Sequence, residues 1–235
     1  MKKWIQSDRV LIGIILVCAV VVISILLSHS QEIFRTKSTL PVEAPIISEE
    51  TNFSEPELKS YSEKLTSGHY IVGIDIPAGV YRITAQSGTG NVYSTNSMNG
   101  GLNEIMGTEK DDVKSFENAD FPAGEVLSVF DVTIKIESDA ADIDGMVKRE
   151  NPAKSIKTLS SGNYVAGKDF DAGAYIITAT KGKGNVYSDN TFRGINAIMA
   201  EKPDEMSIKN FKNVLLEDGT TLTVSDVTIQ IKPSK

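Results

Sequence analysis

Apolar and polar residues alternate with a period of two in several stretches of this chain. The alternation covers residues 81–85, 129–136 and 221–231, which are rich in Val, Ile, Thr and Tyr. Side chains on a β-strand point alternately to opposite faces, and these residue types suit a half-buried strand. No helical period competes with this pattern beyond residue 64. The pattern therefore predicts an all-β fold for the larger part of the chain.

Turn-forming residues separate these stretches at short intervals. Gly-rich runs at 87–91 and 181–185 precede strand-like residues, and we interpret them as hairpin turns rather than phosphate loops, which lead into a helix. Asp, Pro and Gly each favour turns for a separate backbone reason. Short strands joined by such turns are typical of antiparallel sandwiches and barrels. Seven residues receive a structural turn role on this basis: Asp75, Pro77, Gly79, Asp169, Gly173, Asp131 and Asp226.

This pattern occurs twice in the chain, as a sequence repeat. Residues 65–81 return 94 positions later as 159–175, and the match resumes at 90–94 and 184–188 and again in the last strand of each copy. The sequence thus predicts two tandem antiparallel β-sandwich or barrel-like repeats. The first copy is assigned to residues 64–138 and the second copy to 157–235. The connector between them, 139–156, is polar and has room for one helical turn.

A different segment precedes the repeats. Residues 10–27 carry no charge, and their length suits one helix across the hydrocarbon core of a bilayer. Lys2, Lys3 and Arg9 precede this segment, so the positive-inside rule keeps a tail of residues 1–9 in the cytoplasm. We expect a single-pass plasma-membrane protein whose C-terminal domains lie outside the cell.

This segment has two alternative interpretations. Residues 28–30 are a small-x-small triplet, which leaves open a cleaved signal peptide, although the apolar run exceeds the usual length of such signals. Lipidation of Cys18 is disfavoured because bulky apolar residues precede it. Cys18 then serves as a small apolar residue within the membrane span.

Residues 28–63 are predicted to form an acidic linker. They contain Pro residues, seven acids and three bases, and they lack a sustained apolar period. Such a stretch is extended and suits a spacer between membrane and domain. A short helix over residues 55–65 is an alternative for its end.

Composition removes several function classes. The formal net charge is −7, with ten acids and five bases in the first copy and nine acids and ten bases in the second. Neither copy presents a basic stripe, so nucleic acid is not an expected partner. Because no Cys lies outside the membrane segment, disulfides, thiolate nucleophiles and thiolate metal sites are excluded from both copies.

The residues that recur in both copies give little indication of a catalytic site. His69 becomes Asn163 in the second copy, so no His-based triad recurs. The carboxylates that recur are the turn residues named above, which we expect to bond to neighbouring backbone N–H groups. Residues 139–150 resemble a calcium loop but lack acids at two essential positions. We therefore predict no catalytic residue, no metal, no cofactor and no enzymatic activity.

Two groups of side chains are candidates for ligand contact. Aromatic rings on a sheet face can stack on sugars or peptides, and lysines on a loop can contact anions. The alternatives are core packing for the tyrosines and plain solvation for the lysines. Phe116 and Phe211 also recur and are expected in the core. The candidates are Tyr70, Tyr164, Tyr93, Tyr187, Lys181 and Lys183.

The string over residues 68–81, with the pattern G-x-Y-x-V-G-x-D-I-P-A-G-x-Y, resembles a recurrent small β-domain. That domain occurs in membrane-anchored and lipoprotein-like surface proteins of Gram-positive bacteria. In the second copy Val72 becomes Ala166 and Pro77 becomes Asp171, so the motif there is looser. The resemblance implies a bacterial, extracytoplasmic protein and brings no catalytic residues with it.

These observations favour a membrane-anchored binding or interaction protein at the cell surface, whose partner is a cell-envelope component or another protein. One alternative is an envelope enzyme that uses carboxylates. Another is a purely structural spacer or assembly subunit. Most polar groups differ between the copies, as at Arg82 and Ile176 or Glu104 and Ala197. Any specificity is therefore expected to lie where the copies differ.

Overall fold

The computed structural model describes residues 57–235. The predicted cytoplasmic tail, the predicted membrane helix over 10–27 and most of the predicted linker lie outside the described residues. Within 57–235, none of the secondary structure is a helix of the length and apolarity that a bilayer crossing requires.

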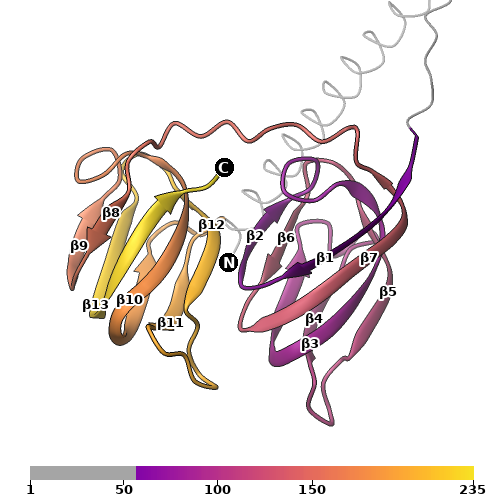
Figure 1. Cartoon of the computed structure of the whole chain (residues 1–235), viewed down its shortest axis with the longest axis horizontal. Coiled ribbons are helices and arrows are strands. Elements are labelled where there is room, and N and C mark those ends of the chain that lie inside the picture. Colours follow the sequence, from indigo (N-terminus) through magenta and orange to yellow (C-terminus); the bar gives the residue numbers. More distant parts are fainter. Residues whose placement is uncertain (1–56) are drawn as a thin grey trace, which may run out of the picture. The chain divides into compact units, whose positions relative to one another are not determined.

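The described part of the chain is built from strands, as the alternating pattern predicts, and contains no helix. Figure 1 shows the first seven strands in indigo to rose and the last six in orange to yellow. The strands are β1 (Lys59–Leu65), β2 (Gly68–Ile71), β3 (Ala78–Ser94), β4 (Asn103–Gly107), β5 (Ser115–Phe121), β6 (Val126–Val129), β7 (Val132–Asp142), β8 (Lys157–Leu159), β9 (Gly162–Val165), β10 (Gly173–Ser188), β11 (Asn196–Ala200), β12 (Asn210–Leu216) and β13 (Thr221–Pro233).

Two long strands organise the pairing. β3 pairs antiparallel with β4, β5, β6 and β7. β10 pairs antiparallel with β11, β12 and β13. Gly79 lies opposite Phe121 in the first set, and Gly173 lies opposite Leu216 in the second. Corresponding residues of the two sequence copies therefore hold corresponding positions in the ladders.

The Gly-rich runs are not hairpin turns, so that prediction is wrong. Both runs lie inside long strands, where β3 passes from pairing with β7 to pairing with β6 and β10 bends along β13. A Cβ on Gly90 would lie 1.7 Å from the carbonyl oxygen of Phe130, and one on Gly184 would lie 1.8 Å from that of Ser225. These glycines are present because another backbone crosses too closely for any side chain.

The start of the folded region also differs from expectation. Residues 59–65 form strand β1 instead of a short helix, and β1 pairs antiparallel with β7 so that Leu65 lies opposite Ile134. Tyr61 packs edge-on against Tyr81. Long-range pairing and core contacts decide the conformation here, and local sequence carries neither signal. The linker thus ends before Lys59, and β7 extends into the predicted connector as far as Asp142.

Each copy encloses its own apolar core. The large buried side chains of the first core are Leu65, Ile76, Tyr81, Ile83, Leu102, Met106, Phe121, Leu127, Ile134 and Ile136. Those of the second core include Tyr175, Ile177, Met199, Phe211, Leu216, Leu222, Ile229 and Ile231. Burying one such side chain contributes about 2 kcal/mol, so the cores supply most of the driving force for folding.

The strands of the two copies meet at one parallel contact between β2 and β12, where Gly68 lies opposite Lys212. The Lys212 amide donates a hydrogen bond of 3.0 Å to the carbonyl of Ser67. A Cβ on Gly68 would lie 2.8 Å from the Lys212 Cβ, so glycine permits this approach. The ladder of one copy therefore continues into the other.

Candidate functional site: the junction between the two copies

Asp75 and Asp169 lie in turns, as predicted, and Asp131 lies in a bend between β6 and β7. Asp226 lies inside strand β13, so its predicted turn role is wrong. The Asp75 carboxylate accepts a hydrogen bond of 2.8 Å from the Ile71 amide, and the Asp169 carboxylate accepts one of 2.7 Å from the Val165 amide. Asp131 and Asp226 both have a φ of 58°, a left-handed conformation that Asp tolerates better than most residues. Burial raises the pKa of Asp131.

The other turn candidates have different roles. Gly79 lies within β3 and Gly173 begins β10. A Cβ on Gly79 would lie 3.2 Å from a carbonyl oxygen of β7, and one on Gly173 would lie 2.4 Å from the Asn151 Oδ1 atom. Close packing therefore explains both glycines. The carbonyl of Pro77 accepts a hydrogen bond from the buried Tyr81 hydroxyl, at 2.7 Å.

The predicted ligand-contact residues do not converge on one surface. Tyr70 is 4% exposed and its hydroxyl donates to the Thr66 carbonyl, which is a core role. Tyr164 is partly buried and donates in the same way to Ser160. Lys181 is exposed, and Lys183 forms an ion pair of 2.5 Å with Asp204.

His69 is buried where the two copies meet. Its Nε2 atom lies 2.8 Å from the Gly194 carbonyl, and its Nδ1 atom lies 2.9 Å from the Ser128 Oγ atom. A carbonyl only accepts, so Nε2 donates to it, and Nδ1 of the neutral ring accepts from the serine. The imidazole also contacts the rings of Phe130 and Phe211. Burial lowers the pKa of His69 to about 4, with a smaller contribution from the charge of Arg193.

The corresponding face of the second copy is polar. Asn163 replaces His69 and accepts a hydrogen bond from Thr223, the counterpart of Ser128, at 2.8 Å. Ser225 replaces Phe130. Tyr93 stacks on Phe130 at 5.9 Å, whereas its counterpart Tyr187 lacks that partner and is 44% exposed. The residues that differ between the two copies thus include those that form the junction.

A cavity of about 620 Å³ opens beside this junction. Its walls come from the first copy, the connector and the second copy. We call this cavity the junction cleft. The lining residues are Ile71, Ile74, Val147, Lys148, Arg149, Glu150, Asn151, Pro152, Ala172, Gly173, Ala174, Arg193, Leu215, Glu217 and Asp218.

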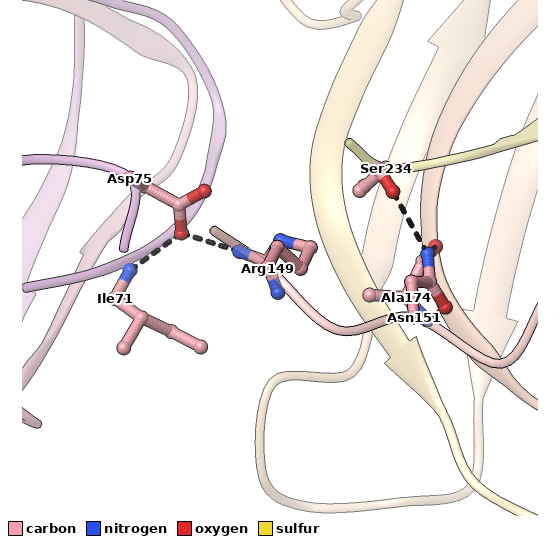
Figure 2. Close-up of polar contacts among 6 residues, drawn as sticks. All are labelled: Ile71, Asp75, Arg149, Asn151, Ala174 and Ser234. Atoms are coloured by element: carbon pink, nitrogen blue, oxygen red, sulfur yellow. Dashed lines mark hydrogen bonds and ion pairs between the residues drawn. The ribbon is translucent and has the colours of Figure 1, made fainter. Parts of the chain in front are cut away.

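Arg149 binds the connector to the first copy (Figure 2). Its guanidinium donates to the Asp75 carboxylate at 2.5 Å, and the two side chains are 5% and 12% exposed. The same Asp75 oxygen accepts from the Ile71 amide, so one carboxylate oxygen holds both a turn and the connector. The Arg149 Nε atom is buried and has no hydrogen-bond partner.

Asn151 fastens the connector to the second copy (Figure 2). Its Nδ2 group donates to the carbonyls of Ala174 and Ser234, at 2.7 and 2.9 Å. Its Oδ1 atom accepts from the amides of Ala153 and Ala174. One side chain thus makes four hydrogen bonds to backbone groups, three of them in the second copy.

We expect Asn151→Ala to lower the free energy of unfolding by about 2 kcal/mol, because it leaves partly buried backbone groups without partners. Chemical denaturation of the full chain measures this loss. The control is Asn103→Ala, which removes an exposed amide of β4 and should change stability by less than about 0.5 kcal/mol. Equal effects of the two substitutions would contradict the fastening role.

Arg193, from the second copy, lines the junction cleft together with Arg149. Its φ is 53°, and its carbonyl accepts from the Leu215 amide at 2.8 Å. The equivalent carbonyl in the first copy belongs to Gly100, with a φ of 85°, and accepts from Asp120. Burial and then the charge of Arg149 lower the pKa of Arg193. Its Nε atom is buried and has no hydrogen-bond partner.

Sequence reasoning missed Arg149, Asn151 and Arg193. The first two lie in the connector, for which the sequence predicts only a polar segment. Arg193 aligns with Gly100 only after the offset between the copies changes from 94 to 93. The sequence signal that could have identified Arg193 is that an arginine aligns with a glycine once this offset is used.

The described residues contain no cluster of His, Cys, Asp or Glu suited to holding a metal ion. Asp131 lines a separate cavity of about 370 Å³ together with Ser67 and Asp204. No protein-family model and no curated protein matches the chain.

Proposed function

We propose that this protein is a non-enzymatic binding protein of a bacterial plasma membrane, spanning it once with the N-terminus in the cytoplasm. In this proposal an acidic spacer carries a tandem duplication of one β-domain outside the cell. Its partner is a cell-envelope component or another protein, and neither nucleic acid nor a cofactor takes part. The uncharged segment over 10–27 and the preceding basic residues support the orientation.

One observation carries the binding role: the junction cleft is built by both copies, mostly at positions where the copies differ. Ile74 corresponds to Lys168, and Leu215 corresponds to Asp120. Ligand sites are concave and mostly apolar, with a few polar groups that fix orientation, and they often lie between domains. A spacer with a purely structural role would have no use for such a cleft.

The carboxylate-enzyme alternative has less support. A pair of acids must converge on a substrate for acid–base catalysis. Asp75 is engaged by a backbone amide and by Arg149. Asp131 lines the other cavity. The recurrent acids therefore serve the fold.

A photo-crosslinking side chain at position 74 tests the binding role in intact cells that carry the full chain. Ile74 lines the cleft, so we expect a covalent adduct with an envelope component. The matched control places the same side chain at Lys168, the exposed counterpart of Ile74 in the second copy. No adduct is expected there.

Equal crosslinking at positions 74 and 168, or none at either, would contradict binding at the junction cleft. An adduct at position 74 that unlabelled envelope extract competes away would support it. Labelling of the exposed Lys181 by a membrane-impermeant amine reagent reports separately whether the second copy is displayed outside the cell.

A further inference from the structure

The backbone of Arg193 is held in a conformation that favours glycine. The first copy places Gly100 at the equivalent position, so the duplicated fold itself requires no side chain there. A non-glycine residue with a positive φ is strained, and such strain persists where the surrounding structure enforces it and gathers at functional sites. The second copy therefore retains an arginine at a backbone cost.

The two arginines are the least exposed charged residues of the junction cleft, whereas Lys148, Glu150, Glu217 and Asp218 are exposed. Arg149 and Arg193 are close enough for the charge of one to lower the pKa of the other. The Asp75 carboxylate bonds to Arg149, and no ion pair within 4 Å is found for Arg193 in the described part of the chain. The Nε atoms of both arginines lack hydrogen-bond partners. Arg149, with a side chain 5% exposed, is thus a buried cation with an unused donor in the cleft wall.

The remaining lining limits what an anionic ligand can be. Glu150, Glu217 and Asp218 line the same cleft and are exposed, so they repel polyanions. Other walls are apolar, from Ile71, Ile74, Val147, Pro152, Ala172 and Leu215. One compact negative group on an apolar body matches both features.

We propose that the junction cleft binds a ligand with one carboxylate on an apolar body, and that the carboxylate lies between the guanidinium groups of Arg193 and Arg149. Guanidinium groups bind carboxylates through paired N–H donors. Such charge-assisted hydrogen bonds are stronger than hydrogen bonds between neutral groups. The C-terminus of a peptide and a short fatty acid share this chemistry. This proposal rests on the binding role and names its ligand class.

Calorimetric titration of the detergent-solubilised full chain tests the ligand class with three probes. N-acetyl-leucyl-alanine carries a free carboxylate, its C-terminal amide lacks the charge, and hexanoate carries the carboxylate without peptide groups. We expect the amide to bind at least tenfold more weakly than the dipeptide acid, because it loses the charge-assisted pair. Binding of hexanoate as tight as that of the dipeptide would assign the ligand to the fatty acids, and weaker binding would assign it to peptides.

Arg193→Gly separates a binding role from a structural one. Gly is the residue of the first copy at this position, so the melting temperature should not fall, while affinity for the dipeptide acid should drop at least tenfold. The matched control is Arg82→Ala, which removes an exposed arginine paired with Glu117 and should leave affinity unchanged. A fall in melting temperature with unchanged affinity would overturn the assignment.

The two proposals fail separately. If neither acid binds, or if acid and amide bind equally, the carboxylate ligand is wrong. Crosslinking at position 74 under the same conditions then decides whether the cleft still binds a partner of other chemistry. Loss of the crosslink as well would remove the binding role itself.

Discussion

Acidification from pH 7 to pH 4 is expected to lower the free energy of unfolding by about 3 kcal/mol through His69 alone. The pKa of this imidazole falls from 6.5 to about 4 in the folded chain, mainly because of burial. The folded state therefore favours the neutral ring. Its contribution is fully present above pH 6.5 and is lost as the pH falls toward 4, because the unfolded chain takes up the proton first. Urea denaturation of the full chain across this range measures the effect.

The control is His69→Asn, which installs the residue of the second copy, Asn163. Carboxylates titrate in both proteins, so the difference between the two pH profiles isolates the imidazole. The variant should lose about 2 kcal/mol at pH 7, since it no longer reaches Gly194 or fills the space between Phe130 and Phe211. Parallel profiles between pH 6.5 and 4 would refute a buried neutral His69.

Removing the charge of Asp75 is expected to cost about 3 kcal/mol, because Asp75→Asn leaves the buried Arg149 guanidinium without an anion. The second copy supplies the comparison. Asp169 holds the equivalent turn through the Val165 amide but has no arginine partner among the described ion pairs. Asp169→Asn should therefore cost about 1 kcal/mol or less.

Thermal and urea unfolding of both variants give the two numbers under identical conditions. The difference between them is the part of the loss that belongs to the connector rather than to the turn. Arg149→Met combined with Asp75→Asn should recover part of the stability, since no buried charge remains without a partner. Equal losses at positions 75 and 169 would show that the ion pair contributes nothing.

Local sequence predicted strands such as β7 and β13 because each of these strands buries one face over most of its length. In β7 and β13 the alternating residues Val132, Ile134 and Ile136, and Val227, Ile229 and Ile231, are buried as their spacing requires. The runs around Gly90 and Gly184 were mistaken for turns for a physical reason. Glycine serves both for a reversal of the chain and for a close crossing, and only the partner strand distinguishes the two.

The site was much less predictable than the fold. Its residues come from the first copy, the connector and the second copy, and those from the two copies are not at equivalent positions of the repeat. In the sequence, Asn151 and Arg149 look like ordinary polar linker residues. Their structural roles depend on partners that only the fold brings close: two backbone carbonyls for Asn151 and a carboxylate for Arg149. Charge and turn propensity are local, whereas the junction cleft depends on how two copies of one pattern meet.

The junction joins unlike faces, because His69 and Phe130 of one copy meet Phe211 and Gly194 of the next. Contacts of this head-to-tail kind have no intrinsic end and can extend into rings or fibres. Here the outer face of the second copy carries Asn163 and Ser225 in place of the imidazole and the phenyl ring. A third domain would find hydrated polar groups where it needs an apolar surface. The contact that joins the first copy to the second is therefore not offered again by the corresponding face of the second copy.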